Sequence, residues 1–228
     1  MFAQLAVASL LAAAPLARAA QNVTVKALPS EDCSSYPGYD AATNTAGPWI
    51  LQLVDSDNTA IEGFGDTSAY SISFNPGVDH KPTLRWGYVS SLNPETAIAK
   101  TALKCDGGVL KALVNTDLTD AGAPTNAQWS ELLFPSNAPY DAPLLWKITD
   151  GIAPQIFEHY VDGVKQDGVF LGAYNTSTRW GLKYNPETSG SYHQDFYYAR
   201  ILGPNSADPV TGEPLKANET TAFVKIWA

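Results

Sequence analysis

The sequence predicts an all-β protein, an antiparallel sandwich or barrel built from two similar halves. Short apolar or alternating segments are separated by turn residues, and 17 glycines and 16 prolines punctuate the 228 residues. These two observations predict the fold class, and a third predicts the halves. Arg85-Trp86-Gly87 and Asn93-Pro94-Glu95-Thr96 recur as Arg179-Trp180-Gly181 and Asn185-Pro186-Glu187-Thr188, which is an internal repeat of about 94 residues.

Two further pairs of segments keep nearly the same offset. Residues 48–55 match 143–150, and residues 129–133 match 223–227. We therefore divide the chain into a signal peptide at 1–20, an extended N-terminal arm at 21–46, a first β repeat at 47–141 and a second at 142–228. We expect the two repeats to form one body, either as one closed barrel or as two packed sheets.

The strands of the first repeat follow from apolar runs and alternation. Residues 50–54 predict a buried strand, and residues 69–74 alternate apolar and polar side chains up to a turn at Asn75-Pro76-Gly77. Further strands are expected at 83–89 and 109–114, followed by a loop at 119–128. Residues 94–104 are the only stretch with helical character.

The second repeat contains more strands and stronger turn signals. Asp162-Gly163 and Asp167-Gly168 are typical of hairpins or tight turns, and residues 203–217 predict a long loop with three prolines. The expected strands are residues 144–149, 155–161, 169–174, 178–184, 192–202 and 221–227.

The start of the chain indicates export, so we expect a secreted protein. Residues 2–16 are apolar, and Ala17-Arg18-Ala19 is a small-x-small cleavage pattern. No later segment is long and apolar enough to span a membrane, so no membrane partner is expected. The formal net charge of −9 and the lack of a basic stripe argue against nucleic acid.

Sequons and cysteines agree with this destination. Asn22, Asn175 and Asn218 each begin an Asn-x-Ser/Thr sequon and are the expected glycosylation sites. The only two cysteines, Cys33 and Cys105, predict one disulfide that ties the arm to the first repeat.

Motifs for common catalytic chemistries are missing from the sequence. There is no His-x-His or His-Glu-x-x-His pair for a metal, no glycine-rich phosphate loop and no dinucleotide fingerprint, so neither a metal nor a cofactor is expected. The nearest match to a serine nucleophile elbow, Thr188-Ser189-Gly190-Ser191, is not one. A glycosidase needs two facing carboxylates, and the sequence does not bring Glu158, Glu187 and Asp195 together.

Residues that the repeat does not duplicate are the candidates for catalysis. The three histidines, His80, His159 and His193, have no counterpart in the other half. Strand alternation places His193, Asp195 and Tyr197 on one face, where a histidine and an aspartate two residues apart can work as an acid–base pair. We predict His159, His193 and Tyr197 as catalytic residues. The alternative is that each histidine is structural, at the surface or buried.

The second copy of the repeated motif supplies the predicted ligand-binding residues. Trp180, Lys183 and Tyr184 follow one another there, and Tyr192 opens the densest aromatic stretch of the chain. A secreted β-protein with 6 Trp, 11 Tyr and 8 Phe residues can line a pocket for a small apolar or aromatic molecule. The alternative is that tryptophan fills the core and the motif arginine pairs with the turn glutamate.

In its layout the chain resembles small secreted glycoproteins of filamentous fungi, with a signal peptide, sequons, one disulfide and an all-β body. Within that group it is similar to the cofactor-free hetero-Diels–Alderases of tropolone–sesquiterpenoid pathways. The resemblance covers the layout of the whole chain and transfers no catalytic residue. It implies a β-fold whose apolar pocket holds a reactive quinone methide and a terpene alkene together, which removes an entropy cost.

A different class of function stays open beside this one. A non-catalytic carbohydrate- or cell-wall-binding protein would place tryptophan and tyrosine in an exposed row rather than in a closed cavity. A secreted hydrolase would need a carboxylate pair or a triad, and the sequence assembles neither.

Overall fold

The computed structural model describes residues 22–74, 83–92, 101–118, 124–136, 142–173, 175–186, 195–203, 206 and 212–228. Every regular element in these ranges is a β-strand, so the all-β prediction is confirmed. None of these residues forms a helix suited to crossing a membrane. The predicted signal peptide at 1–20 lies outside the described residues.

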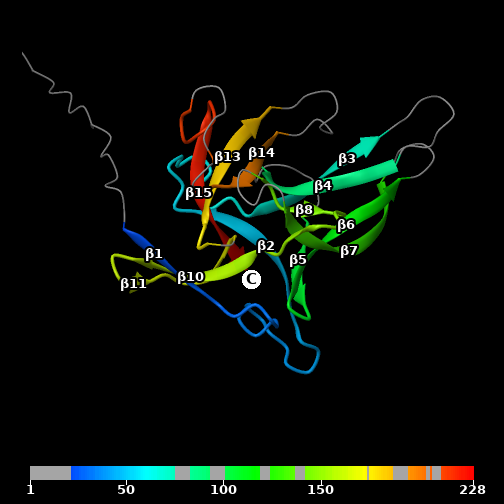
Figure 1. Cartoon of the computed structure of the whole chain (residues 1–228), viewed down its shortest axis with the longest axis horizontal. Coiled ribbons are helices and arrows are strands. Elements are labelled where there is room, and N and C mark those ends of the chain that lie inside the picture. The colour runs from blue at the N-terminus through cyan, green and yellow to red at the C-terminus, as the bar shows by residue number, and fades with distance from the viewer. Residues whose placement is uncertain are drawn as a thin grey trace, which may run out of the picture.

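Nine antiparallel strands close into a barrel (Figure 1). The ring closes because β15 pairs with β13 on one edge and with β2 on the other, where Phe223 lies opposite both Arg179 and Val54. In ring order the strands are β15 (Glu219–Trp227), β13 (Arg179–Asn185), β14 (Phe196–Ile201), β4 (Thr83–Leu92), β8 (Leu145–Trp146), β7 (Pro124–Pro135), β6 (Val109–Leu118), β5 (Leu103–Asp106) and β2 (Thr45–Val54).

The remaining strands are attached to this ring. The strands β12 (Val169–Gly172) and β13 follow one another along the same edge of β15. From β12 the sheet continues outward to β10 (Gln155–Val161) and then to β1 (Val23–Ala27), which form a flap beside the barrel (Figure 1). Shorter pairings add β3 (Asp66–Phe74) to β4, β9 (Gly151–Ile152) to β7 and β11 (Val164–Lys165) to β10.

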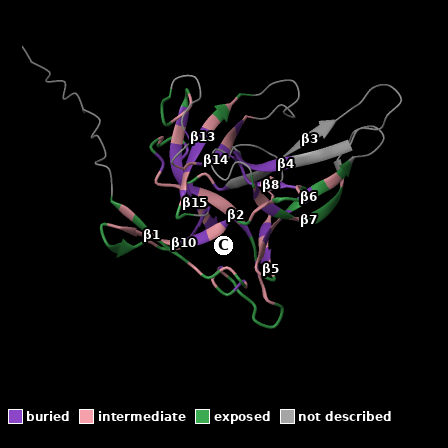
Figure 2. Ribbon diagram, viewed as in Figure 1, coloured by how far each residue is buried: buried purple, intermediate pink, exposed green. Residues whose placement is uncertain are grey.

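Alternation along the strands separates a packed interior from an outer face. On β14 and β15, Ala199, Ile201, Ala222 and Val224 are buried in the main core, and the residues between them face outward. Trp146 packs in the same core, and buried residues concentrate in the centre of the molecule (Figure 2). A valine or isoleucine side chain among them contributes about 1.5–3 kcal/mol when it is fully buried.

The predicted disulfide is present and pins the N-terminal arm to the barrel. Cys33 and Cys105 are bonded across a separation of 72 residues, which in a chain-entropy estimate stabilises the fold by about 4 kcal/mol. Beside it, Tyr36 stacks on Trp49 with ring centroids 5.3 Å apart, and the Trp49 indole N–H donates to the Pro37 carbonyl at 2.9 Å.

Some predicted element boundaries need correction. The loop predicted at 119–128 is wrong in part, because β7 begins at Pro124 and extends β6 into a long hairpin. The helical character predicted for 94–104 is wrong at its end, where Leu103 begins β5, while residues 93–100 lie outside the described part. The arm contains a strand, β1, whose partner β10 is more than 120 residues away, so no local pattern predicts it.

The structure does not show the internal repeat, which stays a prediction. In the second motif, Leu182 is in the core, whereas Tyr88 at the matching place packs outside against Tyr198 at 5.3 Å. Residues 48–55 lie mostly in the ten-residue β2, but the matching residues 143–150 contain only the two-residue β8.

Candidate functional site

The inner faces of β13, β14 and β4 run from the barrel core to one rim. Register sets three rows across these strands: Trp180 beside Ile201, Leu182 beside Ala199, and Tyr184 beside Tyr197 and then Ser91. The first two rows are buried in the core, whereas Tyr184 in the third row is 43% exposed. The polar and aromatic side chains therefore gather where the apolar wall meets solvent.

Three aromatic rings and one carboxylate form this rim. The Tyr184 hydroxyl donates to Asp195 Oδ2 at 2.6 Å, and its ring centroid lies 5.4 Å from that of Tyr197. Phe64 packs its ring edge-on against Tyr197 at 6.0 Å. Sequence reasoning missed both Phe64 and the role of Asp195, although alternation correctly placed Asp195 on the face of Tyr197.

Both tyrosines keep their protons, but only one proton is committed to a partner. The hydrogen bond to Asp195 is the main cause that raises the pKa of Tyr184, with burial and the Asp195 charge adding to it. Burial is the main cause that raises the pKa of Tyr197, and the Asp195 charge adds to it. In the described part of the chain the Tyr197 hydroxyl makes no hydrogen bond. Tyr197 therefore presents a neutral O–H donor at the rim.

The cavity that the described residues line below the rim is small. It has a volume of about 20 Å³, which is room for about one water molecule. The Trp180 indole N–H is already bonded to the Leu171 carbonyl at 3.0 Å, while Ser90 Oγ is buried without a partner among the described residues. A ligand larger than water therefore does not fit in this cavity. The cavity is lined by Leu51, Leu53, Val89, Ser90, Ser91, Leu144, Trp180, Ala199 and Val224.

The structure brings together only part of the predicted site. Trp180 and Tyr184 share one face of β13, as alternation predicts, and the register of β13 with β14 adds Tyr197 to that inner face. Lys183 alternates to the outer face, where it lies in register with Tyr198 and Glu219, so its predicted place in the pocket with Trp180 is not found. Tyr192 and His193, like His80, lie outside the described residues.

His159 lies in a different layer of the molecule. It is 1% exposed on β10, stacks on Phe170 at 3.8 Å and meets the edge of Phe223, a residue on the outer face of β15. Burial, with the nearby charge of Arg179, lowers the pKa of His159 to about 4, and its Nε2 has no partner among the described residues. The barrel wall separates this neutral imidazole from the tyrosine rim, which is the arrangement that the structural alternative predicts.

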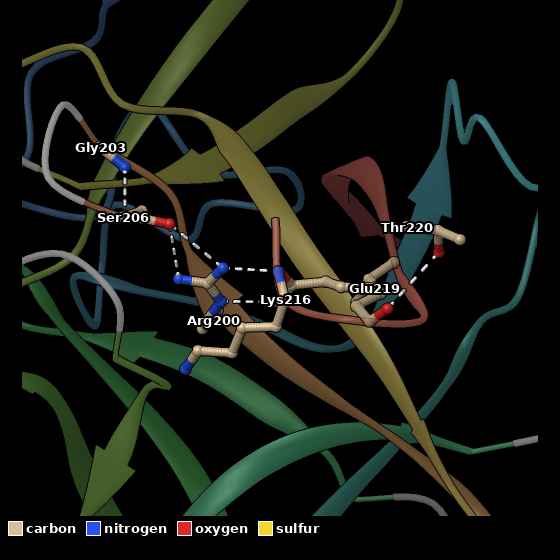
Figure 3. A network of polar contacts seen from close by, with 7 residues as sticks. Arg200, Gly203, Ser206, Lys216, Glu219 and Thr220 are labelled. Atoms are coloured by element: carbon tan, nitrogen blue, oxygen red, sulfur yellow. Dashed lines mark hydrogen bonds and ion pairs between the residues drawn. The ribbon is translucent and has the colours of Figure 1, made fainter. Parts of the chain in front are cut away.

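A buried ion pair lies behind the rim, on the outer face of the same strands. Arg200 is fully buried, and its Nε and Nη2 donate to the two carboxylate oxygens of Glu219 at 2.6 and 2.5 Å. Figure 3 shows the guanidinium between Glu219 and Ser206, whose carbonyl accepts from Nη1 at 3.3 Å. The Lys216 backbone N–H also donates to Glu219. This network fastens Ser206 and Lys216 onto the barrel.

The same ion pair explains the glycine of the second repeated motif. A Cβ atom at Gly181 would lie 2.5 Å from Glu219 Oε1, so only glycine leaves room for that carboxylate. The motif arginine, Arg179, places its guanidinium 4.6 Å over the ring of Phe223. Glu187, its suggested turn partner, lies outside the described residues.

The three predicted glycosylation sites are accessible. Asn22, Asn175 and Asn218 are all exposed, at the start of β1, between β12 and β13, and before β15. Exposure is what an acceptor asparagine requires, and their occupancy stays a prediction.

No protein-family model and no curated protein matches this chain. Within the described ranges, no three His, Cys, Asp or Glu side chains are grouped so that they could hold a metal ion.

Proposed function

We propose that this protein is a secreted glycoprotein that binds a small apolar or aromatic molecule at the rim of its barrel and acts as a cofactor-free hetero-Diels–Alderase. The observation that carries the proposal is the unequal pair of rim tyrosines. The Tyr184 hydroxyl donates its hydrogen bond to Asp195, whereas the hydroxyl of Tyr197 is a neutral donor with no partner among the described residues. We propose as well that the chain is exported and that its two halves arose by internal duplication.

The surroundings of Tyr197 suit a flat, electron-poor ligand. Tyr184 and Phe64 present aromatic surface on two sides of it, and the wall below is apolar. Aromatic rings favour offset or edge-on contacts with a second ring, and one well-placed donor fixes its orientation. The site thus combines an aromatic binding surface with a single polar anchor.

The proposed reaction asks little chemistry of the protein. A quinone methide supplies a C=C–C=O unit and a terpene supplies a C=C bond. One C–O and one C–C bond form in a concerted step, the remaining double bond moves, and no atom is lost. A hydrogen bond from Tyr197 to the carbonyl oxygen would polarise the electron-poor partner, and the proton stays on Tyr197 throughout. Holding both partners in one orientation removes the entropy of their encounter.

The test is a comparison of matched tyrosine variants. A quinone methide generated in situ and a sesquiterpene alkene are supplied to the wild type, to Tyr197→Phe and to Tyr198→Phe, which changes the neighbouring tyrosine on the outer face. We expect Tyr197→Phe to lower kcat/KM by about 100-fold, the lower end of what the loss of one aimed donor costs. Tyr198→Phe should match the wild type.

The products and the binding step are measured separately. Chiral chromatography gives the rate and the enantiomeric excess of the adduct, and intrinsic fluorescence gives the affinity for a stable quinone-methide analogue. A racemic adduct formed at the rate seen without protein would refute the cyclase. Equal affinity of wild type and Tyr197→Phe for the analogue would refute the rim as the binding site.

A further inference from the structure

We propose that the outside of the barrel carries a second binding site, for a neutral oligosaccharide chain, built around Trp227. This site is on the opposite face of the barrel wall from the tyrosine rim and does not depend on the rim's function. Trp227 is 47% exposed at the end of β15, the largest exposed fraction of any described tryptophan. It lines a shallow, open hollow together with Pro48, Trp49, Ile50, Ala102 and Ala228.

The absence of a side chain at Gly65 lets the Trp227 ring pack against the backbone. A Cβ atom at Gly65 would clash with the benzo part of the Trp227 indole, so that ring packs directly on the Gly65 backbone. Ile50, the cross-strand partner of Trp227, supports it from β2. An indole fixed on one side and open to solvent on the other is the arrangement that stacks on the C–H face of a sugar ring.

Polar groups lie in the adjacent row of the same outer face. Gln52 pairs with Lys225 one alternation step away from the pair formed by Ile50 and Trp227, about 7 Å along the strands. Gln52 Nε2 donates to the Gly63 carbonyl at 3.3 Å, and the Lys225 ammonium lies 3.7 Å from Asp167 Oδ2. The second N–H of the amide, its oxygen and the other N–H groups of the ammonium can bond the hydroxyl groups around a stacked ring. The six residues that line the hollow carry no charged side chain, which favours a neutral chain over an acidic one.

The size of the surface argues against a protein partner. The exposed parts of the large apolar side chains Trp227, Trp129 and Leu113 add to roughly 300 Å². A stable protein interface needs about 800 Å² from each partner. None of the three sequon asparagines lines the hollow, and Asn218 is at the opposite end of β15, about 30 Å away. A glycan on Asn218 would therefore start far from the hollow.

Trp129 provides a matched control. It is also exposed, at 36%, and also lies on the outer face, but the ammonium of Lys104 sits 4.9 Å from its ring centroid. One face of this indole is thus already occupied by a cation. A loss of binding specific to Trp227 separates the proposed site from a general effect of removing a surface tryptophan.

The experiment measures retention of the purified full-length protein on cellulose, chitin and insoluble β-1,3-glucan. The matching hexasaccharides are then titrated against intrinsic fluorescence. We expect retention on at least one polymer, a loss of about tenfold or more in affinity for Trp227→Ala and for Gly65→Ala, and no change for Trp129→Ala. Circular dichroism confirms folding, and Trp227→Tyr replaces Gly65→Ala if the latter does not fold.

Three outcomes would overturn the proposal. One is the absence of retention on all three polymers, and another is equal affinity of wild type and Trp227→Ala. The third is a dimer, seen by sedimentation, that Trp227→Ala converts to a monomer, because a second copy of the chain would then occupy the surface. None of these outcomes affects the assay of the rim, since Trp227→Ala leaves Tyr184 and Tyr197 unchanged.

Discussion

The two faces of β13 and β14 differ in how their polar groups are bonded. On the outer face, Arg200 and Glu219 are fully buried, and the bonds of their charged groups are made within the protein. On the inner face, Tyr184 and Tyr197 stand at the edge of an apolar wall, and one of their two protons has no partner in the described chain. Buried polar groups whose hydrogen bonds are all made within the protein stabilise the fold. A donor without a partner at an open rim is available to a ligand.

The difference shows which of the predicted residues to regard as structural. His159 belongs to the covered side, stacked on Phe170 and neutral, and Lys183 also points outward. Trp180 lies on the inner face, but its N–H is committed to the Leu171 carbonyl. The division between covered and open faces therefore leaves Tyr197, with Tyr184 and Asp195 beside it, as the group able to act on a ligand.

The largest expected effect comes from breaking the buried ion pair. Arg200→Leu leaves the Glu219 carboxylate buried without its partner, which typically costs about 3–5 kcal/mol of folding free energy. Chemical denaturation monitored by circular dichroism measures the loss. The double variant Arg200→Leu/Glu219→Leu, which leaves no unpaired charge, should recover a large part of it. If Arg200→Leu unfolds at the same denaturant concentration as the wild type, the covered face is not the structural one.

The next effect is a pH dependence that originates at His159. In the unfolded chain its pKa is about 6.5, and in the folded protein burial and Arg179 lower it to about 4. The unfolded state therefore binds the extra proton first, and stability falls as the pH drops from 6.5 to 4, by about 3 kcal/mol in total. Unfolding curves at pH 7, 5.5 and 4 measure this loss.

The control for this prediction is His159→Leu, which cannot bind the proton. The carboxylates act equally in both proteins, so the stability difference between variant and wild type should move in favour of the variant as the pH falls through this window. Turnover and ligand affinity at pH 7 should be unchanged. A large loss of turnover in folded His159→Leu would mean that this histidine is catalytic. The outer face would then not be purely structural.

Much of the fold and part of the site follow from local sequence patterns. The all-β class follows from alternation and turn residues, and the Cys33–Cys105 bond follows from the cysteine count and the predicted export. Alternation also groups Trp180 with Tyr184 and sets Asp195 beside Tyr197. The prediction of Lys183 in the pocket relied on its closeness to Trp180 along the chain, whereas alternation puts Lys183 on the outer face.

What the sequence could not show depends on pairing between distant strands. The barrel closes where β2 meets β15, and Arg200 meets Glu219 only because β13 brings β14 and β15 into one register. The hydrogen bond between Tyr184 and Asp195 likewise needs the β13–β14 pairing, which joins residues on either side of a connection. Such partners are set by register, and a one-residue shift would exchange the two faces.

A smaller effect on stability is expected at Gly181, where an added side chain would point to the outer face. Gly181→Ala places a methyl group against Glu219 Oε1, and the grip of Arg200 keeps that carboxylate from moving away. We expect a loss of about 1–3 kcal/mol, typical of overpacking, with ligand affinity at the rim unchanged. Denaturation of Gly181→Ala in the Glu219→Gln background is the control, because it separates the steric clash from the ion pair.

The smallest effect on stability and the sharpest on function is expected at Asp195. Its carboxylate accepts a hydrogen bond from the Tyr184 hydroxyl, and its charge raises the pKa of both rim tyrosines. Asp195→Asn should therefore lower both pKa values, and that of Tyr184 more. Absorbance titration of tyrosinate measures the pKa shift. The control is Asp150→Asn, which changes an exposed aspartate elsewhere. The unfolding midpoint should stay within error of the wild type.

The decisive reading is stereochemical. With Asp195 in place only Tyr197 donates to the ligand, whereas Asp195→Ala frees the Tyr184 proton and offers the carbonyl oxygen two donors in different places. The rate should then persist while the enantiomeric excess of the adduct falls, because the two donors hold the diene in different orientations. Asp195→Asn keeps an acceptor for Tyr184 without the charge, so it should retain more of the selectivity than Asp195→Ala. Equal selectivity in all three proteins would mean that the inner rim does not orient the reacting partners.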